Sequence, residues 1–353
     1  MNALLERMKK SSTIKRSDIL SDSDILTDKE CIQTEVPFMN VALGGDFLGG
    51  IRAGLTMLAG PSKHFKTLFA LIMASAFQRK YKDGIVLFYD SEFGTPPAYF
   101  NSLNMDTSRI FHTPITDVEE LKTDIMNQLK EFKRTDKVFI IIDSVGNLAS
   151  KKEIDDALDG KTVADMTRAK AMKSLFRMIT PHLTLKDIPL VAINHTYQTL
   201  ELYSKAIVAG GTGSYYSSDN IWIIGRQQEK DGDDLVGWNF VINVEKSRYT
   251  KEKSKIPITV TYSNGIDKWS GFLDNALESG HIIKNTSTKP HKFFIVDQET
   301  GEVSEEGYPL KSIPERVWEN LMKDARFHNF VKNKYSVESE TSLIAKDTTD
   351  DNE

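Results

Sequence analysis

The sequence is poor in cysteine, with one, Cys31, among its 353 residues. A single thiol cannot form an internal disulfide, so the chain suits a reducing compartment. Long apolar runs are also lacking: the longest, residues 68–77, falls well short of the roughly 20 residues that span a bilayer. The basic start, residues 1–16, has no apolar segment of the kind found in signal peptides. We therefore expect a cytoplasmic protein that has no membrane partner.

An excess of one charge is lacking as well. The chain has 45 Lys and Arg against 50 Asp and Glu, which gives a net charge of −5. This balance excludes a protein that holds nucleic acid through its overall charge and leaves local basic patches as the means of contact. A hydrophobic content of 40% excludes disorder over the full length. The length predicts about two domains, or one large core with appendages.

Short apolar runs alternate with helical periodicity through the middle of the chain. Runs of this kind, rich in β-branched residues, are typical of strands buried on both faces of a parallel sheet. The fold class that follows is α/β, with a mostly parallel twisted sheet flanked by helices. Three later runs with short connections predict antiparallel pairs. The expected strands are 55–60, 85–90, 138–143, 189–194, 221–226, 240–245 and 256–262, and the expected helices are 67–81, 117–133 and 163–180.

We expect a core over 36–270 with appendages at both ends. Residues 1–35 form an N-terminal arm of segregated charge, whose Leu4, Leu5 and Met8 share one helical face and suit a contact between subunits. Residues 271–335 form a small C-terminal region with helices over 272–280 and 315–335. Residues 336–353 form an acidic, solvated tail.

The segment 60–67 resembles a phosphate-binding loop. The pattern is G-x-x-x-x-G-K-[ST] between a strand and a helix, and Phe65 stands where the second glycine belongs. Backbone amides would cradle phosphate oxygens, Lys66 on an exposed helix start would reach the β- and γ-phosphates, and Thr67 would bind Mg²⁺. The residues of this loop are Gly60, Pro61, Ser62, Lys63, His64, Phe65, Lys66 and Thr67.

Two further strands end in acidic residues. Asp143, followed by Ser144, ends an apolar run and could hold Mg²⁺ beside the loop. Glu92 lies two residues beyond the end of another strand, where a free carboxylate could deprotonate the water that attacks the γ-phosphate. Asp90 competes for that role, but its place at the strand end favours a structural hydrogen bond. Together these features predict a nucleoside triphosphatase.

Motifs in a fixed order make the chain resemble the RecA-type recombinases and, within them, the UvsX-type recombinases of phages. The resemblance covers about residues 30–280. Its carriers include LAGPSKHFKT (58–67), LFYDSEFGTPPAY (87–99), IIDSVGNLASKKE (141–153) and VEKSR (244–248).

The resemblance implies a role for each matching residue. Glu92 matches the catalytic glutamate, Asp143 the Mg²⁺-site aspartate, and Tyr99 the aromatic residue that stacks on adenine. His195 stands where RecA has a glutamine that senses the γ-phosphate, so the sensing chemistry differs here. Lys246 and Arg248 match cations that reach the ATP of the neighbouring subunit, in the manner of an arginine finger.

Two mobile DNA-binding loops are implied at about 151–165 and 196–214. Single-strand binders combine a positive track with planar groups, and glycines suit a segment that orders on binding. The expected DNA contacts are Lys151, Lys152, Arg168, Tyr197, Lys205, Gly210 and Gly211.

We expect an ATP- and Mg²⁺-dependent DNA recombinase that forms a filament on single-stranded DNA and exchanges strands with homologous double-stranded DNA. Its implied partners are both forms of DNA, further copies of itself, a phage recombination mediator and a single-stranded-DNA-binding protein. Two alternatives stay open at this point. A ring helicase would need a further domain ahead of the core, and a regulatory ATPase without DNA would need an arginine-rich lid.

Overall fold

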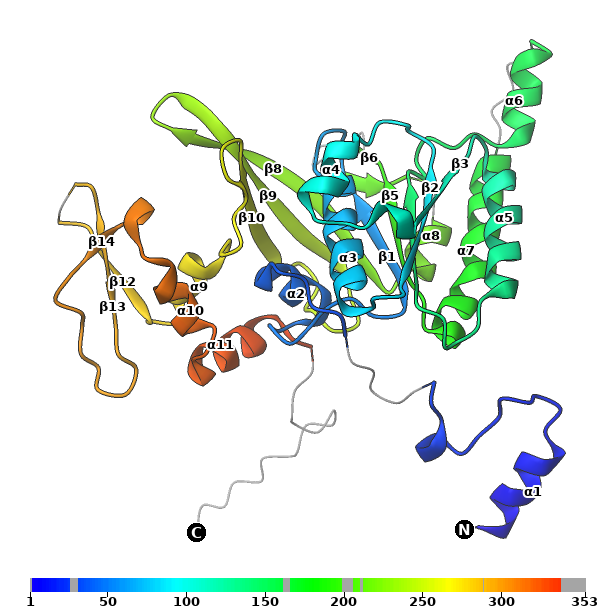
Figure 1. Ribbon diagram of the computed structural model, residues 1–353, viewed down its shortest axis with the longest axis horizontal. Coiled ribbons are helices and arrows are strands. Elements are labelled where there is room, and N and C mark those ends of the chain that lie inside the picture. Colours follow the sequence, from blue (N-terminus) through cyan, green and yellow to red (C-terminus); the bar gives the residue numbers. More distant parts are fainter. Residues whose placement is uncertain are drawn as a thin grey trace, which may run out of the picture.

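One sheet of nine strands, in the order β11-β10-β9-β8-β1-β5-β4-β2-β3, runs through the middle of the protein. The computed structural model describes residues 2–25, 31–160, 166–198, 206–209, 212–287 and 289–337 (Figure 1). The strands from β8 to β3 are all parallel. They are β1 (Gly54–Ala59), β2 (Ile85–Asp90), β3 (Ile110–Pro114), β4 (Val138–Asp143), β5 (Pro189–Asn194) and β8 (Asn220–Asp231).

The parallel strands confirm the α/β prediction. β1, β4 and β5 are buried at every position, as the near-continuous apolar runs predicted. β3 was not predicted, because this edge strand is half-exposed and its sequence, IFHTP, lacks a continuous apolar run. The carboxyl ends of β1, β2, β4 and β5 lie on the same side of the sheet, and we call this row of strand ends the carboxyl edge, as distinct from a lateral edge strand such as β3. The opposite edge, where they begin, is the amino edge.

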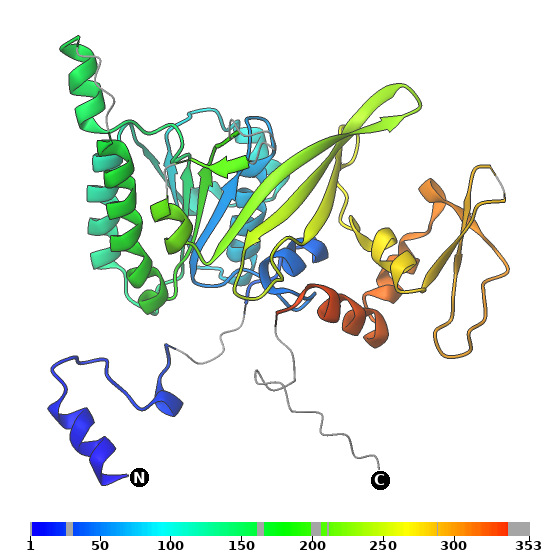
Figure 2. The same ribbon diagram turned by 180° about the vertical axis from the view of Figure 1, so that it is seen from behind.

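Helices cover both faces of this sheet (Figures 1 and 2). On one face α3 (Lys66–Lys80) and α2 (Pro37–Gly44) pack over side chains such as Phe88 and Phe139. On the other face α5 (Val118–Glu131) and α7 (Thr167–Lys186) pack over side chains such as Leu87 and Ile140. Successive strand residues point to opposite faces, so each buried strand contributes to both cores.

The sheet continues beyond β8 with antiparallel strands, as predicted. β8 pairs with β9 (Asp234–Lys246), β9 with β10 (Lys255–Thr261), and β10 with β11 (Gly265–Ile266). The β8–β9 hairpin extends past the carboxyl edge (Figure 2).

The C-terminal region corrects one prediction. The segment 315–335 is two helices rather than one, because the Asp324 carboxylate caps a new helix by accepting from Arg326 N and Phe327 N. A small antiparallel sheet, β12-β13-β14, occupies residues that showed no clear periodicity. The elements are α9 (Phe272–Glu278), β12 (Ile282–Asn285), β13 (Lys292–Ile295), β14 (Tyr308–Pro309), η3 (Leu310–Ser312), α10 (Glu315–Leu321) and α11 (Ala325–Tyr335).

Aromatic rings join this region to α2. Phe38 lies 5.4 Å from Phe272 and 6.1 Å from Tyr335, measured between ring centroids. Phe47, just after α2, lies 5.5 Å from Phe272 and 5.8 Å from Phe327. The C-terminal region therefore shares one apolar core with the start of the central domain.

The predicted arm is only partly outside the core: residues 2–25 lie outside it (Figure 1), whereas Ile32 and Thr34 are buried and Ile32 pairs with Ile51 beside β1. Its α1 (Ala3–Ser11) exposes Leu4, Leu5 and Met8, and η1 (Leu20–Asp22) follows. A subunit contact by this face stays a prediction, and residues 338–353 of the acidic tail lie outside the described residues. Over the ranges that the structure describes, no helix is both long enough and apolar enough to cross a bilayer. The remaining elements are α4 (Pro97–Ser102), η2 (Thr107–Arg109), α6 (Lys151–Leu158), β6 (Thr196–Gln198), β7 (Ala206–Val208) and α8 (Thr212–Ser217).

Candidate nucleotide-binding site

The loop between β1 and α3 keeps the backbone of a phosphate-binding loop without its second glycine. Phe65 has φ 61° and Lys63 has φ 60°, both in the left-handed region. That conformation costs a non-glycine residue about 1–2 kcal/mol. The ring of Phe65 stacks on Phe240 of β9 at 4.7 Å, and such a contact offsets part of the cost. The side chain at position 65 therefore packs beneath the loop against β9.

Lys66 is buried, which corrects the expectation of an exposed side chain. Its Nζ donates to the carbonyls of Gly60 (3.0 Å) and Pro61 (2.8 Å), because the loop folds back over the start of α3. Burial lowers the pKa of the Lys66 ammonium, and the carboxylates of Glu92 and Asp143 partly oppose that shift. The ammonium is thus held at the centre of the loop by neutral acceptors.

Thr67 and Asp143 meet across the start of α3 and the end of β4. The Thr67 hydroxyl donates to Asp143 Oδ2 at 2.7 Å. Asp143 Oδ1 is buried and has no hydrogen-bond partner among the described residues. Burial raises the pKa of Asp143 to about 6, and the Thr67 hydrogen bond opposes the shift. A hydroxyl and a carboxylate with an unpaired oxygen are ligands that suit Mg²⁺.

Glu92 lies at the centre of a polar cluster built from three strand ends. Its Oε1 accepts from the Ser144 hydroxyl (2.7 Å) and from Asn147 Nδ2 (3.0 Å). His195 Nε2 lies 3.4 Å from the same oxygen and 3.1 Å from Asn147 Oδ1. The structure thus brings together Glu92, Ser144 and His195, as the sequence predicted. Asn147 was not singled out, although it lies four residues after Asp143 in the quoted motif.

Asp90 has the structural role that its place at the strand end predicted. Its Oδ1 accepts from the backbone N–H groups of Glu92 (3.0 Å) and Phe93 (2.8 Å), and its Oδ2 lies 3.2 Å from His112 Nε2. These bonds fix the turn after β2, where Phe93 has φ 53°. Asp90 therefore holds the backbone that carries Glu92.

A cavity of about 530 Å³ at the carboxyl edge collects these groups. Tyr99 on α4 is 39% exposed and lines this cavity, and its stacking on a base stays a prediction. The cavity is also lined by Arg226 of β8, Trp238 of β9 and Tyr262 just after β10, which no sequence motif marks. The predicted residues that line the cavity are Ser62, Lys63, His64, Phe65, Lys66, Thr67, Glu92, Tyr99, Asp143 and His195.

The first expected DNA loop is partly helical. Lys151 and Lys152 open α6, where Ser150 and Glu153 form a capping box. Both lysines are exposed, and Lys152 pairs with Asp156. Tyr197 on β6 is 52% exposed. The remaining predicted contacts in this group, Lys205, Gly210 and Gly211, lie outside the described residues.

Arg168 has partners within its own chain. Its Nε donates to the carbonyl of Leu148 (2.6 Å), and its Nη2 donates to those of Val145 (3.1 Å) and Gly146 (2.7 Å). The guanidinium thereby ties α7 to the segment that follows β4. A DNA contact by Arg168 stays a prediction, and in this structure its donors serve the fold.

Lys246 and Arg248 lie where β9 ends, away from the cavity of their own chain. Lys246 Nζ donates to the Tyr215 carbonyl (2.9 Å), and Arg248 Nε pairs with Asp219 Oδ1 (2.6 Å). The other oxygen of Asp219 accepts from Leu55 N at the start of β1, which places Arg248 at the amino edge. Their contact with the ATP of a neighbouring copy stays a prediction.

Comparison with known proteins agrees with this geometry. The family model of the RecA N-terminal domain matches residues 3–267. The chain belongs to the RecA family. It is 48% identical to the "Recombination and repair protein" of Enterobacteria phage T4 over 96% of this chain and 87% of that protein. It is also 29% identical to "Protein RecA" of Arthrobacter sp. (strain FB24), over 73% of this chain and 72% of the relative.

Membership in the RecA family confirms the resemblance predicted from the motifs and the predicted fold. It also supports the predicted role of a RecA-like recombinase in recombination and repair. Proteins of this family bind ATP and Mg²⁺ and are in general DNA-dependent ATPases.

Proposed function

We propose that this RecA-family chain hydrolyses ATP in its carboxyl-edge cavity and uses the bound nucleotide to assemble on single-stranded DNA and exchange strands. One observation carries the proposal. Lys66, the Thr67–Asp143 pair and Glu92 reach one cavity from three strand ends. Each is the residue type that one part of phosphoryl transfer needs.

Binding uses groups that are already in place. The Lys66 ammonium exchanges its loop carbonyls for phosphate oxygens, which are stronger partners because they are charged. Thr67 and Asp143 would hold Mg²⁺, which neutralises phosphate charge. The ring of Tyr99 covers the base.

Hydrolysis depends on the cluster around Glu92. Its carboxylate accepts the proton of the attacking water, while Ser144 and Asn147 hold its orientation. His195 forms a hydrogen bond with Asn147, which in turn donates to Glu92. A shift of the imidazole toward the γ-phosphate therefore changes the position of the Glu92 carboxylate. This contact connects the nucleotide to β6, which begins at the next residue and carries Tyr197.

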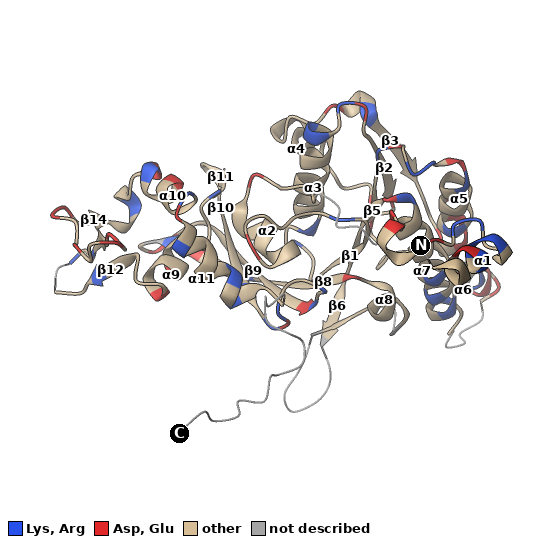
Figure 3. Cartoon of the chain, turned by 90° about the horizontal axis from the view of Figure 1, so that it is seen from below, with Lys and Arg blue, Asp and Glu red and all other residues tan. Residues whose placement is uncertain are grey.

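Assembly completes the site. Lys246 and Arg248 of one copy would reach the phosphates bound by the next copy, since they lie away from their own cavity. Figure 3 shows basic and acidic residues interspersed along the described chain. DNA contacts therefore come from local groups such as Lys151, Lys152 and Tyr197. A mediator and a single-stranded-DNA-binding protein complete the proposed set of partners.

The test is strand exchange with homologous and heterologous duplex, together with ATP hydrolysis measured with and without single-stranded DNA. We expect exchange with the homologous duplex only and hydrolysis stimulated by DNA. Electron micrographs with a slowly hydrolysed ATP analogue should show helical filaments. Rings that unwind any duplex would favour a helicase, and hydrolysis indifferent to DNA would favour a regulatory ATPase.

A further inference from the structure

The hairpin β8–β9 contacts the phosphate loop at a point that the proposed chemistry does not use. Arg226 Nη1 donates to the carbonyl of Lys63 at 3.1 Å. The same guanidinium lies 4.2 Å above the ring of Trp238. Arg226 of β8 thus contacts both the phosphate loop and the Trp238 ring of the neighbouring strand β9.

Trp238 is itself held in place. Its Nε1 donates to the Tyr262 hydroxyl at 3.0 Å, and its partly buried ring packs against the core. Arg226, Trp238 and Tyr262 therefore form a connected group across β8, β9 and the end of β10, which we call the brace. All three line the nucleotide cavity.

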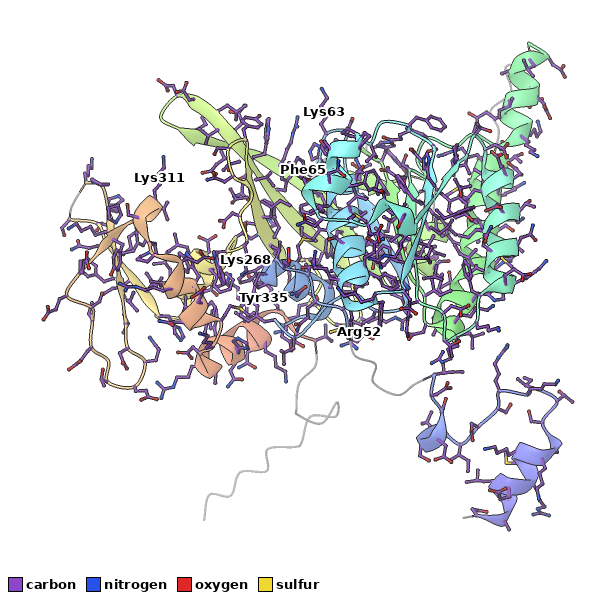
Figure 4. The ribbon with its side chains drawn as sticks, viewed as in Figure 1. Arg52, Lys63, Phe65, Lys268, Lys311 and Tyr335 are labelled. Carbon is purple, nitrogen blue, oxygen red and sulfur yellow. The ribbon has the colours of Figure 1, made fainter. Side chains whose placement is uncertain are left out.

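The loop has a particular need for such support. Lys63 and Phe65 both have left-handed backbone angles that glycine adopts freely and other residues avoid. Each is contacted from the hairpin: Lys63 by Arg226 and Phe65 by Phe240. Figure 4 shows Lys63 projecting beyond the carboxyl edge and Phe65 beneath it. The Arg226 hydrogen bond and the Phe240 ring thus contact the loop at the two residues whose backbone is strained.

We propose that Arg226 is a positioning residue, braced by Trp238 and Tyr262, that holds the phosphate loop in the conformation that binds nucleotide. The inference rests on the proposed ATP site and adds a residue to it. Without the brace, the strained loop relaxes and only a fraction of molecules stays competent to bind. The apparent dissociation constant rises as that fraction falls, while turnover of bound ATP changes little.

The first experiment is Arg226→Ala in the full chain, with Mg·ATP and Mg·ADP affinity measured by titration and KM and kcat measured on single-stranded DNA. We expect both dissociation constants and KM to rise about tenfold or more and kcat to stay within about threefold. Arg134→Ala is the matched control, since Arg134 also donates to a backbone carbonyl, that of Leu185 at 2.7 Å, at the other edge of the sheet. A fall in kcat at unchanged KM would overturn the inference.

A double-mutant cycle separates positioning from direct contact with the nucleotide. Lys63→Gly removes the strain at position 63 but keeps the carbonyl, so Arg226→Ala should cost less than about threefold in that background. An equal cost in both backgrounds would overturn the inference. Thermal unfolding of each variant checks that the fold is intact. Failure of the parent protein to bind nucleotide would instead reject the proposed function, so the two failures are distinct.

Discussion

The two edges of the central sheet both gather cations but hold them differently. At the carboxyl edge Lys66 is buried and bonded to the neutral carbonyls of Gly60 and Pro61. At the amino edge Arg248 pairs with the Asp219 carboxylate, and Arg52 lies 4.6 Å above the Tyr249 ring. Figure 4 shows the two edges through Lys63 and Arg52 at opposite ends of the core.

This difference indicates that the cations of the two edges exchange their partners in different ways. Neutral acceptors release a cation to phosphate readily, so the carboxyl edge is prepared to bind nucleotide within one chain. At the amino edge Arg248 has a carboxylate partner, which an incoming phosphate would have to replace, whereas Lys246 donates to the neutral Tyr215 carbonyl.

Lys66→Ala should remove nucleotide binding and lower ATP turnover by about 10²–10³-fold or more, because it deletes a positioned charge together with the hydrogen bonds that this charge donates to the Gly60 and Pro61 carbonyls. Titration with Mg·ATP and steady-state hydrolysis measure both. Lys82→Ala, an exposed lysine beyond the end of α3, is the control. Unchanged affinity and turnover would reject the assignment of the phosphate loop.

Glu92→Gln should keep ATP and DNA binding but lower hydrolysis by roughly 10²-fold or more, the scale of a positioned general base. The amide oxygen can still accept from Ser144 and Asn147, so the cluster stays assembled. Filaments formed with ATP should then persist, which light scattering follows over time. If Asp90→Asn has this effect and Glu92→Gln does not, the base is Asp90.

Mixing two inactive variants tests the amino edge. Lys246→Ala subunits keep the Glu92 base but cannot supply the Lys246 ammonium to the neighbouring ATP site. Glu92→Gln subunits supply that ammonium but lack the base. In an equal mixture on long single-stranded DNA, roughly a quarter of the junctions combine the intact halves, so turnover should recover to about that fraction. Lys255→Ala, which changes an exposed lysine at the start of β10, should behave as the parent protein. No recovery, with both variants bound to DNA, would show that Lys246 does not act in trans.

The pH dependence of stability tests the burial of Asp143. Its pKa is raised from an ordinary value near 4 to about 6, so the folded state resists ionisation. The free energy of unfolding of the nucleotide-free protein should therefore lose about 1–3 kcal/mol as the pH rises from about 4 to 6. Thermal melts measure this, and Asp143→Asn should lack that component of the loss. A mutant profile parallel to that of the parent would show that Asp143 titrates at its ordinary pKa.

Much of the fold and site follows from local sequence. β1, β4 and β5 are predictable because burial on both faces demands continuous apolar runs. The meeting of Lys66, Glu92 and Asp143 follows because parallel strands end at one edge. These arguments need the order of the elements and their ends, which the sequence carries.

The rest depends on contacts between distant segments. Arg226, Trp238 and Tyr262 lie on antiparallel strands whose register decides what they face, and their spacing carries no motif. The burial of Lys66 follows from the path of the loop over α3. The break near residue 324 depends on one capping side chain within an otherwise helical pattern.

The aromatic cluster around α2 has a consequence for how the chain is made. Phe38 and Phe47 leave the ribosome long before their partners Phe272, Phe327 and Tyr335. A nascent chain that stops at Gly271 leaves those early rings uncovered. The last step of folding therefore waits for the C-terminal region, and until then the beginning of the central domain is exposed to chaperones and proteases.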